Sequence, residues 1–549
     1  MKIALAQLNY HIGNFESNTA KIIDNINKAR QNGADLVVFA ELCVCGYPSR
    51  DFLEFDEFID LCDQSAKKIA AACTDMACII GIPTPNNDSE GKDLWNSAYF
   101  IENGEIKATV NKALLPNYDI FDEYRYFEPS TQFSCIDFKG HRIALTICED
   151  LWNNIENPLY VTRPMDILIE QQPDVMINIA ASPFAVKHDD ERIDILRDNA
   201  SRYNLPLFYV NQVGAQTELI FDGGSLVFDN TGKLVDELPY FEESLTYYTL
   251  EKDAGIKLHQ PATLKTERPA DIEQIHQAVI LGIKDYFYKS GFSRAILGLS
   301  GGIDSAVVCA LAAEALGAEN VMAVLLPSRF SSDHSLKDAE DLVENLGCKH
   351  EIIAIKHVTE AFEAALSPQF KNLPFNIAEE NIQSRSRAIL LMAMCNKFGY
   401  ILLNTSNKSE AAVGYGTLYG DMCGGISVIG DVYKTQVFEL ARYINREREI
   451  IPENSIIKPP SAELRPDQKD SDSLPEYDIL DKIIAEYVEN RRSSGDIIRM
   501  GYDEQTVRRT IKLINLAEHK RYQTPPILRV SSKAFGMGRR MPIVGKYLS

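Results

Sequence analysis

Short apolar segments alternate with amphipathic, helix-like segments through both halves of this chain, and that alternation limits the possible folds more than any other feature. Residues 18–32 place apolar side chains at helical spacing and are followed by Gly33, a common helix stop signal. The first half also contains short apolar segments typical of buried strands, namely residues 2–8, 35–40, 77–81, 96–101, 142–147, 175–179 and 207–211. Such alternation predicts layered α/β domains.

The pattern lapses near the middle of the chain, where residues 251–261 are polar and interrupted by glycine and proline. We therefore predict a linker at 253–270, which separates a first domain at 1–252 from a second domain at 271–549. In the second domain, a strand–turn–helix pattern starts at residue 294. The chain has 549 residues, of which 45% are hydrophobic, so each of two large domains can bury a full core.

The charge balance excludes some classes of partner. There are 56 Lys and Arg residues against 78 Asp and Glu residues, which gives a net charge of −22. Nucleic acids bind to basic surfaces, so a nucleic acid is not expected as the main partner, whereas a small phosphorylated substrate in a locally basic pocket is compatible with this charge.

The first residues lack the pattern of a secretory signal, and no apolar stretch of about 18 residues indicates a membrane span. The 11 cysteines lack zinc-site spacing and are typical of reduced thiols. We expect a cytoplasmic protein without a membrane partner.

A glycine-rich loop in the second half lies between an apolar strand and a helix-forming run. Its residues are Gly298, Leu299, Ser300, Gly301, Gly302, Ile303, Asp304 and Ser305. Glycines let backbone N–H groups approach phosphate oxygens, and a following helix N-terminus adds partial positive charge. Asp304 offers a carboxylate to Mg²⁺. An ordinary glycine turn is the alternative for Gly-Gly alone, but the full string in this context favours a nucleotide site. It is not a Walker A loop, because the lysine of that motif is absent.

The loop resembles the pyrophosphatase loop of the N-type ATP pyrophosphatases, which adenylate a carboxylate or carbonyl oxygen and release pyrophosphate. The resemblance implies that residues 298–305 contact ATP. A loop that holds the β- and γ-phosphates would stabilise the departing pyrophosphate. Arg329, in the string Pro327-Ser-Arg-Phe, is a further candidate ATP contact.

Three residues of the first half suggest amide hydrolysis. Glu41 and Cys148 each follow a predicted strand, and Lys112 lies in the string Val110-Asn-Lys-Ala. Ligands of α/β sheets bind beyond the strand C-termini, so these side chains can converge. A carboxylate can activate a thiol, and an ammonium group can stabilise an oxyanion. Taken singly, Cys148 can be a packed core thiol, Glu41 a strand-end charge and Lys112 a solvated charge.

In their sequence order, the strings around these residues resemble the carbon–nitrogen hydrolase (nitrilase) superfamily. The resemblance implies that Glu41 is the general base, Lys112 the oxyanion stabiliser and Cys148 the nucleophile. It also implies that Glu123 orients the site. The remaining residues that it assigns to glutamine binding are Tyr118, Ser182 and His188. In that superfamily the last of these positions usually holds Lys or Arg, and here Lys187 precedes His188, so either side chain can take the role.

From Met1 to about Lys546 the chain resembles the glutamine-dependent NAD synthetases. The resemblance implies a nitrilase-like α-β-β-α sandwich followed by a Rossmann-like, parallel-sheet ATP pyrophosphatase domain. It implies that ammonia from L-glutamine is ligated to deamido-NAD, which ATP activates by adenylation, giving NAD, AMP and pyrophosphate. Mg²⁺ is expected with ATP, and no permanently bound organic cofactor is expected. By the same resemblance we expect a homo-oligomer.

Two strings of the second half carry this resemblance, residues 381–387 and 405–421. They imply that Thr405 contacts ATP and that Glu410 shares Mg²⁺ with Asp304. The implied contacts to deamido-NAD are Asn381, Glu410, Tyr415, Gly416, Thr417, Leu418, Lys434 and Lys520, with Lys434 meeting a phosphate. A solvated helix face is the alternative for Glu410 and Lys434.

Three other functions remain as alternatives. An amidotransferase with the same loop can amidate a purine or an amino acid, and assays with those acceptors separate it from the expected enzyme. A non-catalytic scaffold requires missing catalytic residues, and an RNA-modifying enzyme does not fit the charge of −22. The long polar stretch 459–477 is either a lid over the adenylate or a surface loop.

Overall fold

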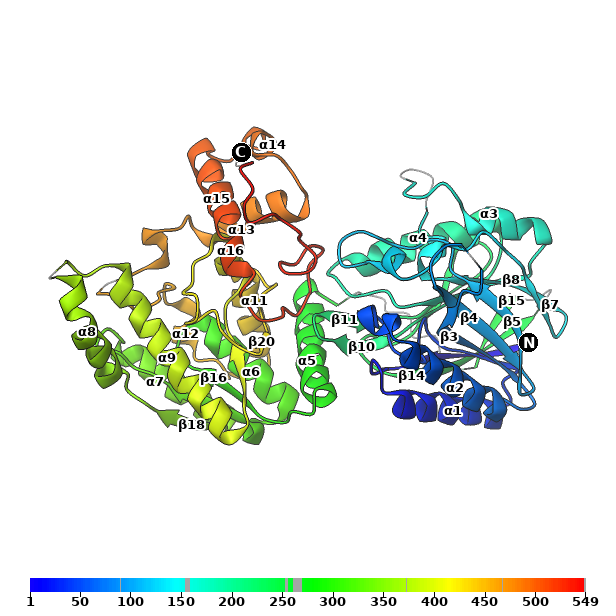
Figure 1. Ribbon diagram of the computed structural model, residues 1–549, viewed down its shortest axis with the longest axis horizontal. Helices are drawn as coiled ribbons and strands as arrows, with labels where there is room; N and C mark the ends of the chain where they lie inside the picture. The colour runs from blue at the N-terminus through cyan, green and yellow to red at the C-terminus, as the bar shows by residue number, and fades with distance from the viewer. Residues whose placement is uncertain are drawn as a thin grey trace. The chain divides into compact units, whose positions relative to one another are not determined.

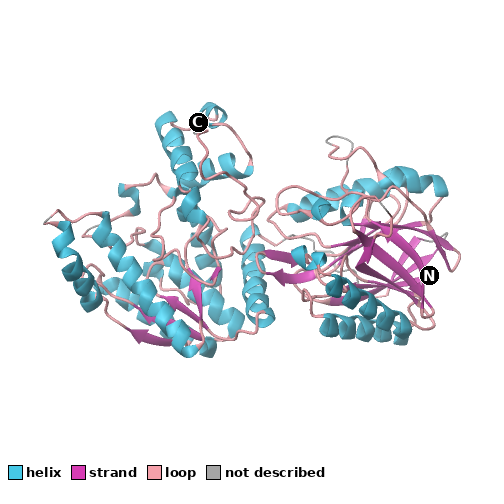
Figure 2. Ribbon diagram, in the orientation of Figure 1, coloured by secondary structure: helices cyan, strands magenta, loops and turns pink. Residues whose placement is uncertain are grey.

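The computed structural model describes residues 1–88, 90–153, 158–251, 255–259, 269–371, 373–466 and 468–547. The chain divides into two compact units, Met1–Arg268 and Pro269–Ser549. Each unit contains β-sheet covered by helices (Figures 1 and 2). Among the described residues, no helix is long and apolar enough to cross a membrane. All 11 cysteines are free thiols.

The first unit contains two large sheets and a hairpin. The seven-stranded sheet has the order β15-β14-β1-β2-β3-β4-β5 and the six-stranded sheet the order β13-β12-β9-β8-β7-β6. The strands of the first sheet are β1 (Lys2–Gln7), β2 (Leu36–Val38), β3 (Ala77–Pro85), β4 (Leu94–Glu102), β5 (Glu105–Asn111), β14 (Ser244–Glu251) and β15 (Gly255–Leu258). Those of the second sheet are β6 (Ile136–Phe138), β7 (His141–Ile147), β8 (Val175–Ala180), β9 (Leu207–Asn211), β12 (Leu226–Phe228) and β13 (Leu234–Glu237). The hairpin is formed by β10 (Val213–Gln216) and β11 (Leu219–Asp222).

Side-chain alternation along the strands builds the layers of this unit. In β1, Ile3 and Leu5 belong to the core shared by the two sheets, whereas Ala4 and Ala6 belong to the core under α1 and α2. The helices are α1 (Phe15–Gln31), α2 (Asp56–Ala72), α3 (Pro164–Leu168) and α4 (His188–Tyr203). Helix α4 packs on the second sheet through Ile193 and Leu196. The predicted α-β-β-α sandwich is therefore the observed arrangement.

The second unit is built on a five-stranded parallel sheet of order β18-β17-β16-β19-β20. Its strands are β16 (Ala295–Gly298), β17 (Val321–Leu325), β18 (Lys349–Ile352), β19 (Ile401–Asn404) and β20 (Ile426–Ser427). Its helices are α5 (Asp271–Lys289), α6 (Ile303–Leu316), α7 (Asp333–Leu346), α8 (Lys356–Phe370), α9 (Ile377–Phe398), α10 (Lys408–Val413), α11 (Lys434–Ile444), α12 (Glu453–Ile457), α13 (Tyr477–Ile484), α14 (Ser494–Arg499), α15 (Glu504–Leu516) and α16 (Glu518–Arg521). The chain moves outward from β16 in both directions, which creates a ligand crevice at the C-terminal ends of β16 and β19.

Each strand predicted in the first half overlaps an observed strand, and α1 and α6 lie where helical spacing or a helix-forming run predicts helices. The predicted linker 253–270 spans the division between the units. Its residues 255–258 form β15, which pairs antiparallel with β14 and so extends the first sheet. Residues 253, 254 and 260–268 lie outside the described part of the chain.

Candidate active sites

In the first unit, one buried lysine joins two carboxylates. The Nζ atom of Lys112 lies 2.7 Å from Oε1 of Glu41 and 2.8 Å from Oε2 of Glu123. Glu41 and Lys112 have no exposed surface, and Glu123 is 5% exposed. Glu41 follows β2 and Lys112 follows β5, in the same sheet. The solvated alternative for Lys112 and the strand-end alternative for Glu41 are therefore wrong.

The charged groups of this cluster shift one another's pKa values. Burial alone would lower the pKa of Lys112, but the charges of Glu123 and Glu41 outweigh burial and raise it well above its usual value. Burial raises the pKa of Glu123 to about 7, because the neighbouring Lys112 offsets burial only in part and Glu41 raises the pKa further. Lys112 thus stays charged, whereas Glu123 can change protonation state near neutral pH.

Two polar side chains that the sequence reasoning missed complete this cluster. Asn96 Nδ2 donates to Glu41 Oε1 at 2.7 Å, and the hydroxyl of Tyr47 donates to Glu123 Oε1 at 2.9 Å. The backbone N–H of Ala181 donates to Glu41 Oε2 at 3.0 Å. A signal for Asn96 exists in the sequence, since it is an amide inside the predicted buried strand 96–101, where a polar side chain needs hydrogen-bond partners.

Cys148 starts a short 3₁₀ turn, η3 (Cys148–Leu151), directly after β7. Its side chain is buried and its φ is +44°, a conformation that a residue with a side chain adopts only with support from its surroundings. Burial raises the pKa of the Cys148 thiol well above its usual value, and Glu41 raises it further while Lys112 lowers it. The resting thiol is therefore protonated, and a base must remove its proton before it can attack a substrate.

The residues predicted to hold glutamine lie around the Cys148 turn. The hydroxyl of Tyr118 donates to Oε1 of Glu149 at 2.9 Å, and Glu149 is the neighbour of Cys148 in sequence. The hydroxyl oxygen of Ser182 lies 3.4 Å from Nε2 of His188, which begins α4. The ring of His188 stacks on Trp152 with centroids 5.1 Å apart. Of the two candidates at this position, His188 contacts Ser182 through its side chain.

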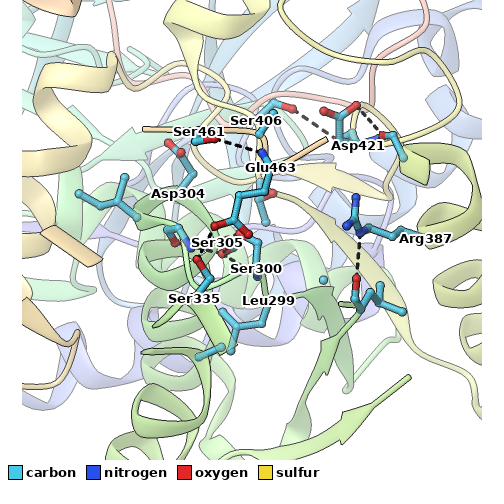
Figure 3. A pocket seen from close by; sticks show the side chains of 18 of the residues that line it. Leu299, Ser300, Asp304, Ser305, Ser335, Arg387, Ser406, Asp421, Ser461 and Glu463 are labelled. Atoms are coloured by element: carbon cyan, nitrogen blue, oxygen red, sulfur yellow. Dashed lines mark hydrogen bonds between the residues drawn. The ribbon is translucent and has the colours of Figure 1, made fainter. Parts of the chain in front are cut away.

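In the second unit, a cavity of about 300 Å³ lies at the expected crevice beyond β16 and β19 (Figure 3). Predicted site residues line much of it, namely Gly298, Leu299, Ser300, Gly302, Ile303, Asp304, Ser305, Thr405, Glu410, Tyr415 and Lys434. The cavity also has lining residues that the sequence reasoning did not select, among them Ser335, Arg387 and Asp421. The residues of the predicted nucleotide loop and those after β19 therefore share one cavity.

The loop at residues 298–305 is held by its own serines and by α7. Ser305 Oγ accepts the N–H of Ser300 at 3.2 Å, and Ser300 Oγ accepts the N–H of Gly302 at 3.2 Å. Gly301 has a φ of +80°, and a Cβ atom there would lie 2.1 Å from the carbonyl oxygen of Ser335. Glycine is required at position 301 because the loop packs backbone to backbone against α7.

Lys434 lies between two carboxylates at this cavity. Its ammonium group donates to Asp304 Oδ2 and lies 3.6 Å from Oε1 of Glu410, and it is 2% exposed. Asn407 Nδ2 donates to the other oxygen of Asp304 at 2.8 Å. Burial raises the pKa of Glu410 to about 8, and the charge of Asp304 raises it while Lys434 lowers it. The solvated-face alternative for Glu410 and Lys434 is therefore wrong.

A second polar network lies next to the cavity, around residues 414–418. Lys520 Nζ donates to the carbonyl oxygens of Gly414 at 2.8 Å and Gly416 at 2.7 Å. The hydroxyl of Thr417 donates to Asn381 Oδ1 at 2.8 Å. The carbonyl oxygen of Leu418 accepts from Arg385 Nε at 3.1 Å. These contacts bring together Asn381, Lys520 and the loop that the sequence places at one substrate site.

Two further predictions concern the stretch 459–477 and Arg329. Residues 459–464, the start of the long polar stretch, line the cavity. Glu463 accepts a hydrogen bond from Ser335 Oγ at 2.8 Å (Figure 3). It also accepts one from Ser332 Oγ at 3.0 Å. Arg329 is half-exposed, pairs with Glu363 at 3.2 Å and lies outside the lining residues.

The helix that carries Glu410 is tied to the C-terminal segment. Lys408 is fully buried at the start of α10, and its Nζ lies 3.0 Å from Asp431 and 2.8 Å from Glu489. The same Nζ donates to Ser531 Oγ at 2.6 Å and to the carbonyl oxygen of Lys533 at 3.1 Å. A buried cation with four oxygen partners fixes the start of α10, and with it Asn407 and Glu410.

Comparisons with known proteins agree with both units. The carbon-nitrogen hydrolase family matches residues 2–257, and the NAD synthase family matches residues 275–524. A glutamine-dependent NAD(+) synthetase of Synechocystis is 46% identical over 548 residues, which cover 98% of each chain. That of Acinetobacter baylyi is 41% identical over 99% of this chain and 98% of its own. The chain belongs to the family of glutamine-dependent NAD synthetases.

Glutamine-dependent NAD synthetases of known structure share the whole fold. The enzyme of Acinetobacter baumannii has a TM-score of 0.79 at 37% identity, with 100% of this chain and 99% of that chain covered. The enzyme of Cytophaga hutchinsonii has a TM-score of 0.82 at 23% identity, with 100% and 98% covered, and shows the fold alone. The predicted α/β fold and the predicted enzyme class, a carbon–nitrogen ligase of NAD biosynthesis, are confirmed. The other amidotransferases, the scaffold and the RNA-modifying enzyme are excluded as alternatives.

Proposed function

We propose that the first unit hydrolyses L-glutamine at Cys148 and that the second unit ligates the ammonia to ATP-activated deamido-NAD, giving NAD, AMP and pyrophosphate. The observation that carries the first half of this proposal is the fully buried Lys112 held between Glu41 and Glu123. A buried cation with two carboxylate partners is costly to assemble, which is typical of a site where charge must be stabilised during a reaction.

Glu41 is the base in this proposal. A carboxylate offers about four acceptor sites, two on each oxygen. Oε1 accepts from Asn96 and Lys112, and Oε2 accepts from the N–H of Ala181, which leaves one site on Oε2 for the thiol proton of Cys148. Removal of that proton produces the thiolate that attacks the carboxamide carbon of glutamine.

Lys112 is the oxyanion stabiliser. An ammonium group has three N–H donors, and Nζ contacts one oxygen of Glu41 and both oxygens of Glu123, at 3.0 and 2.8 Å. In this proposal the two oxygens of Glu123 share one donor, so that one donor is available to the oxyanion of the tetrahedral intermediate. Glu123 keeps Lys112 charged and oriented. Ammonia leaves with a proton returned by Glu41, and water then hydrolyses the thioester on Cys148.

The glutamine backbone has charged ends that need partners. Ser182 and His188 are adjacent donors suited to its α-carboxylate, and His188 takes this role in our proposal rather than Lys187. Glu149 is buried beside Cys148 and is held by the hydroxyls of Tyr118 and Tyr160, which suits its carboxylate to the α-ammonium group.

In the second unit, we assign the loop 298–305 and Thr405 to ATP, and residues 415–418, Asn381 and Lys520 to deamido-NAD. Asp304 and Glu410 fit Mg²⁺, because this ion is usually held by one or two carboxylates with substrate phosphates completing its shell. Within the described residues no group of three or more acidic, histidine or cysteine side chains forms a full metal site, which agrees with such sharing. When bound, the ion would neutralise charge on the departing pyrophosphate. Lys434 would meet a phosphate from the same side.

The remaining parts of the proposal rest on the family resemblance alone. We assign ATP contact to Arg329, which lies outside the residues that line the cavity. A homo-oligomer is proposed, with its size to be measured by sedimentation. A cytoplasmic location and reliance on small-molecule substrates alone complete the assignment.

Replacement of the proposed nucleophile tests whether glutamine hydrolysis and NAD synthesis occur at separate sites. We expect Cys148→Ala to lose NAD formation when glutamine is the nitrogen donor and to keep it when ammonium chloride is the donor. Cys135→Ala, in the same unit, is the matched control and should keep both activities. Loss of both activities in a folded Cys148→Ala protein, or retention of both, would refute the proposal.

The stretch 459–477 is proposed to close over the adenylate, since its first residues already line the cavity. ATP together with deamido-NAD should protect this stretch from limited proteolysis. Unchanged cleavage at saturating substrates would contradict a closing role.

A further inference from the structure

A single carboxylate connects the segment that carries Lys112 to the segment that carries Cys148. Asp150 Oδ1 accepts the backbone N–H groups of Ala113 at 3.0 Å and Leu114 at 2.9 Å. Its other oxygen, Oδ2, accepts the N–H of Ile147 at 3.0 Å. Asp150 is 5% exposed, so these three N–H groups take the place of water as hydrogen-bond donors to its carboxylate.

The contact joins two different sheets. Ala113 and Leu114 follow Lys112 at the end of β5, an edge strand of the seven-stranded sheet. Ile147 ends β7, which belongs to the six-stranded sheet. Backbone hydrogen bonds fix the register of strands within a sheet, whereas the core that the two sheets share is built of apolar side chains, which do not set a distance sharply. A hydrogen-bonded carboxylate between them sets that distance.

The same carboxylate supports the unusual backbone of the nucleophile. Cys148 has a φ of +44°, and the bond from the Ile147 N–H to Asp150 Oδ2 closes the turn around it, from the residue before Cys148 to the second residue after it. On the far side, Asn178 Nδ2 donates to the carbonyl oxygen of Cys148 at 3.4 Å. A left-handed conformation persists only when its surroundings impose it, and Asp150 supplies the shorter of these two bonds.

The side chain must be an acceptor on both oxygens. Three N–H groups point at it, so an amide in its place would set an NH₂ group against a backbone N–H. Burial raises the pKa of Asp150 to about 6, while the N–H of Ile147 and then those of Leu114 and Ala113 lower it. The ionised form that accepts all three bonds is thus present at neutral pH.

We propose that Asp150 is a positioning residue that sets the separation and orientation of the Cys148 thiol relative to the Lys112 ammonium. This inference rests on the proposed roles of Cys148 and Lys112. Asp150 itself touches neither the substrate nor the reacting atoms in this account, and it acts through the backbone of residues 113, 114 and 147.

The test compares Asp150→Asn with Asp236→Asn. Asp236 is a buried aspartate of the same unit that accepts the hydroxyl of Tyr248 at 2.8 Å, and it has no part in the site. The reactivity of Cys148 is measured as the rate of its alkylation by iodoacetamide, in which the Sγ–carbon bond forms and iodide leaves. Labelling is followed by peptide mass spectrometry, beside kcat and KM for glutamine and ammonia-dependent NAD formation in the full chain.

We expect Asp150→Asn to lower the alkylation rate and the glutaminase kcat at least tenfold, with KM for glutamine changed less than threefold and ammonia-dependent synthesis kept. Asp236→Asn should lose stability without a change in the alkylation rate. An alkylation rate and kcat of Asp150→Asn within twofold of the wild type would overturn the inference. So would an equal loss in both variants, because that pattern marks a general structural effect.

A second variant and a wild-type control distinguish failure of this inference from misfolding and from failure of the proposed function. If Asp150→Asn does not fold, Asp150→Glu keeps the charge but lengthens the side chain, and it should show the same loss of Cys148 reactivity with unchanged reactivity again overturning the inference. If alkylation of wild-type Cys148 leaves glutamine-dependent synthesis intact, the proposed function fails instead.

Discussion

Replacement of Lys112 by methionine gives the sharpest test of the buried cluster. Methionine has a similar volume but no charge, so Glu41 and Glu123 are left facing each other without the cation between them. Breaking a buried ion pair in this way costs about 3–5 kcal/mol of unfolding free energy. Because glutamine hydrolysis also loses its oxyanion donor, we expect its rate to fall by a factor of about 10²–10³.

The pH dependence of that loss follows from the protons involved. Below about pH 7 the wild type already carries a proton on Glu123, whose pKa is raised to about 7. In the variant, Glu123 loses the charge of Lys112 that lowers its pKa, so this pKa rises above about 7. Above pH 7 the folded variant therefore keeps a proton that the folded wild type releases and that the unfolded chain does not carry. A proton bound only in the folded state makes stability fall as pH rises, so the destabilisation of the variant relative to the wild type should grow by about 1.4 kcal/mol for each pH unit above 7.

Tryptophan fluorescence measures this difference for the first unit alone. Both tryptophans, Trp95 and Trp152, lie in that unit, so urea unfolding followed by fluorescence does not report on the second unit. Lys107→Met is the matched control, because Lys107 lies on β5, the strand that leads to Lys112, is half-exposed and pairs with Glu105. An exposed pair of this kind contributes about 0–1 kcal/mol. A destabilisation of Lys112→Met below about 1 kcal/mol, or one that does not change with pH, would refute the reasoning.

Two predictions concern the second unit. Glu410→Gln keeps the shape of the side chain but offers Mg²⁺ a neutral ligand, so the Mg²⁺ concentration needed for ATP–pyrophosphate exchange should rise at least tenfold; an unchanged Mg²⁺ titration would count against Glu410 as a ligand. Gly301→Ala places a Cβ atom 2.1 Å from the carbonyl oxygen of Ser335 at a φ of +80°, and should cost at least about 1–3 kcal/mol and abolish ATP-dependent activity. Gly302→Ala, whose Cβ meets only Ser300 Oγ at 3.3 Å, is its control, and equal losses in calorimetry would contradict the packing argument.

The buried strands are predictable from sequence because their surroundings are uniform. Strand β8 is buried along its whole length, and its sequence is correspondingly apolar. Strand β5 is different, since it forms the edge of its sheet and exposes much of Glu105–Asn111, so its sequence resembles a polar loop. Strand β14 pairs with β1, although almost the whole sequence of the first unit lies between them. A local sequence pattern does not indicate which distant strand will be the partner.

The residues of the candidate site likewise differ in how well they can be predicted from sequence. Glu41 and Cys148 are predictable because each is a reactive side chain directly after an apolar strand. Asp150 escapes the same reasoning because its partners are backbone N–H groups, which every residue except proline carries and which leave no trace in the sequence. The ATP contact predicted for Arg329 stays a prediction, because its side chain pairs with Glu363 and lies outside the residues that line the cavity.

The buried ammonium of Lys408 has a consequence for the order in which the protein matures during synthesis. Its carboxylate partners Asp431 and Glu489 are made first, but Ser531 and Lys533 are made long after α10, so the nascent second unit lacks two of the four oxygen partners of this ammonium until those residues emerge from the ribosome. The first unit closes earlier, once β14 can pair with β1. A ribosome paused between these two points would therefore carry a glutaminase that already releases ammonia, joined to a ligase that does not yet consume it.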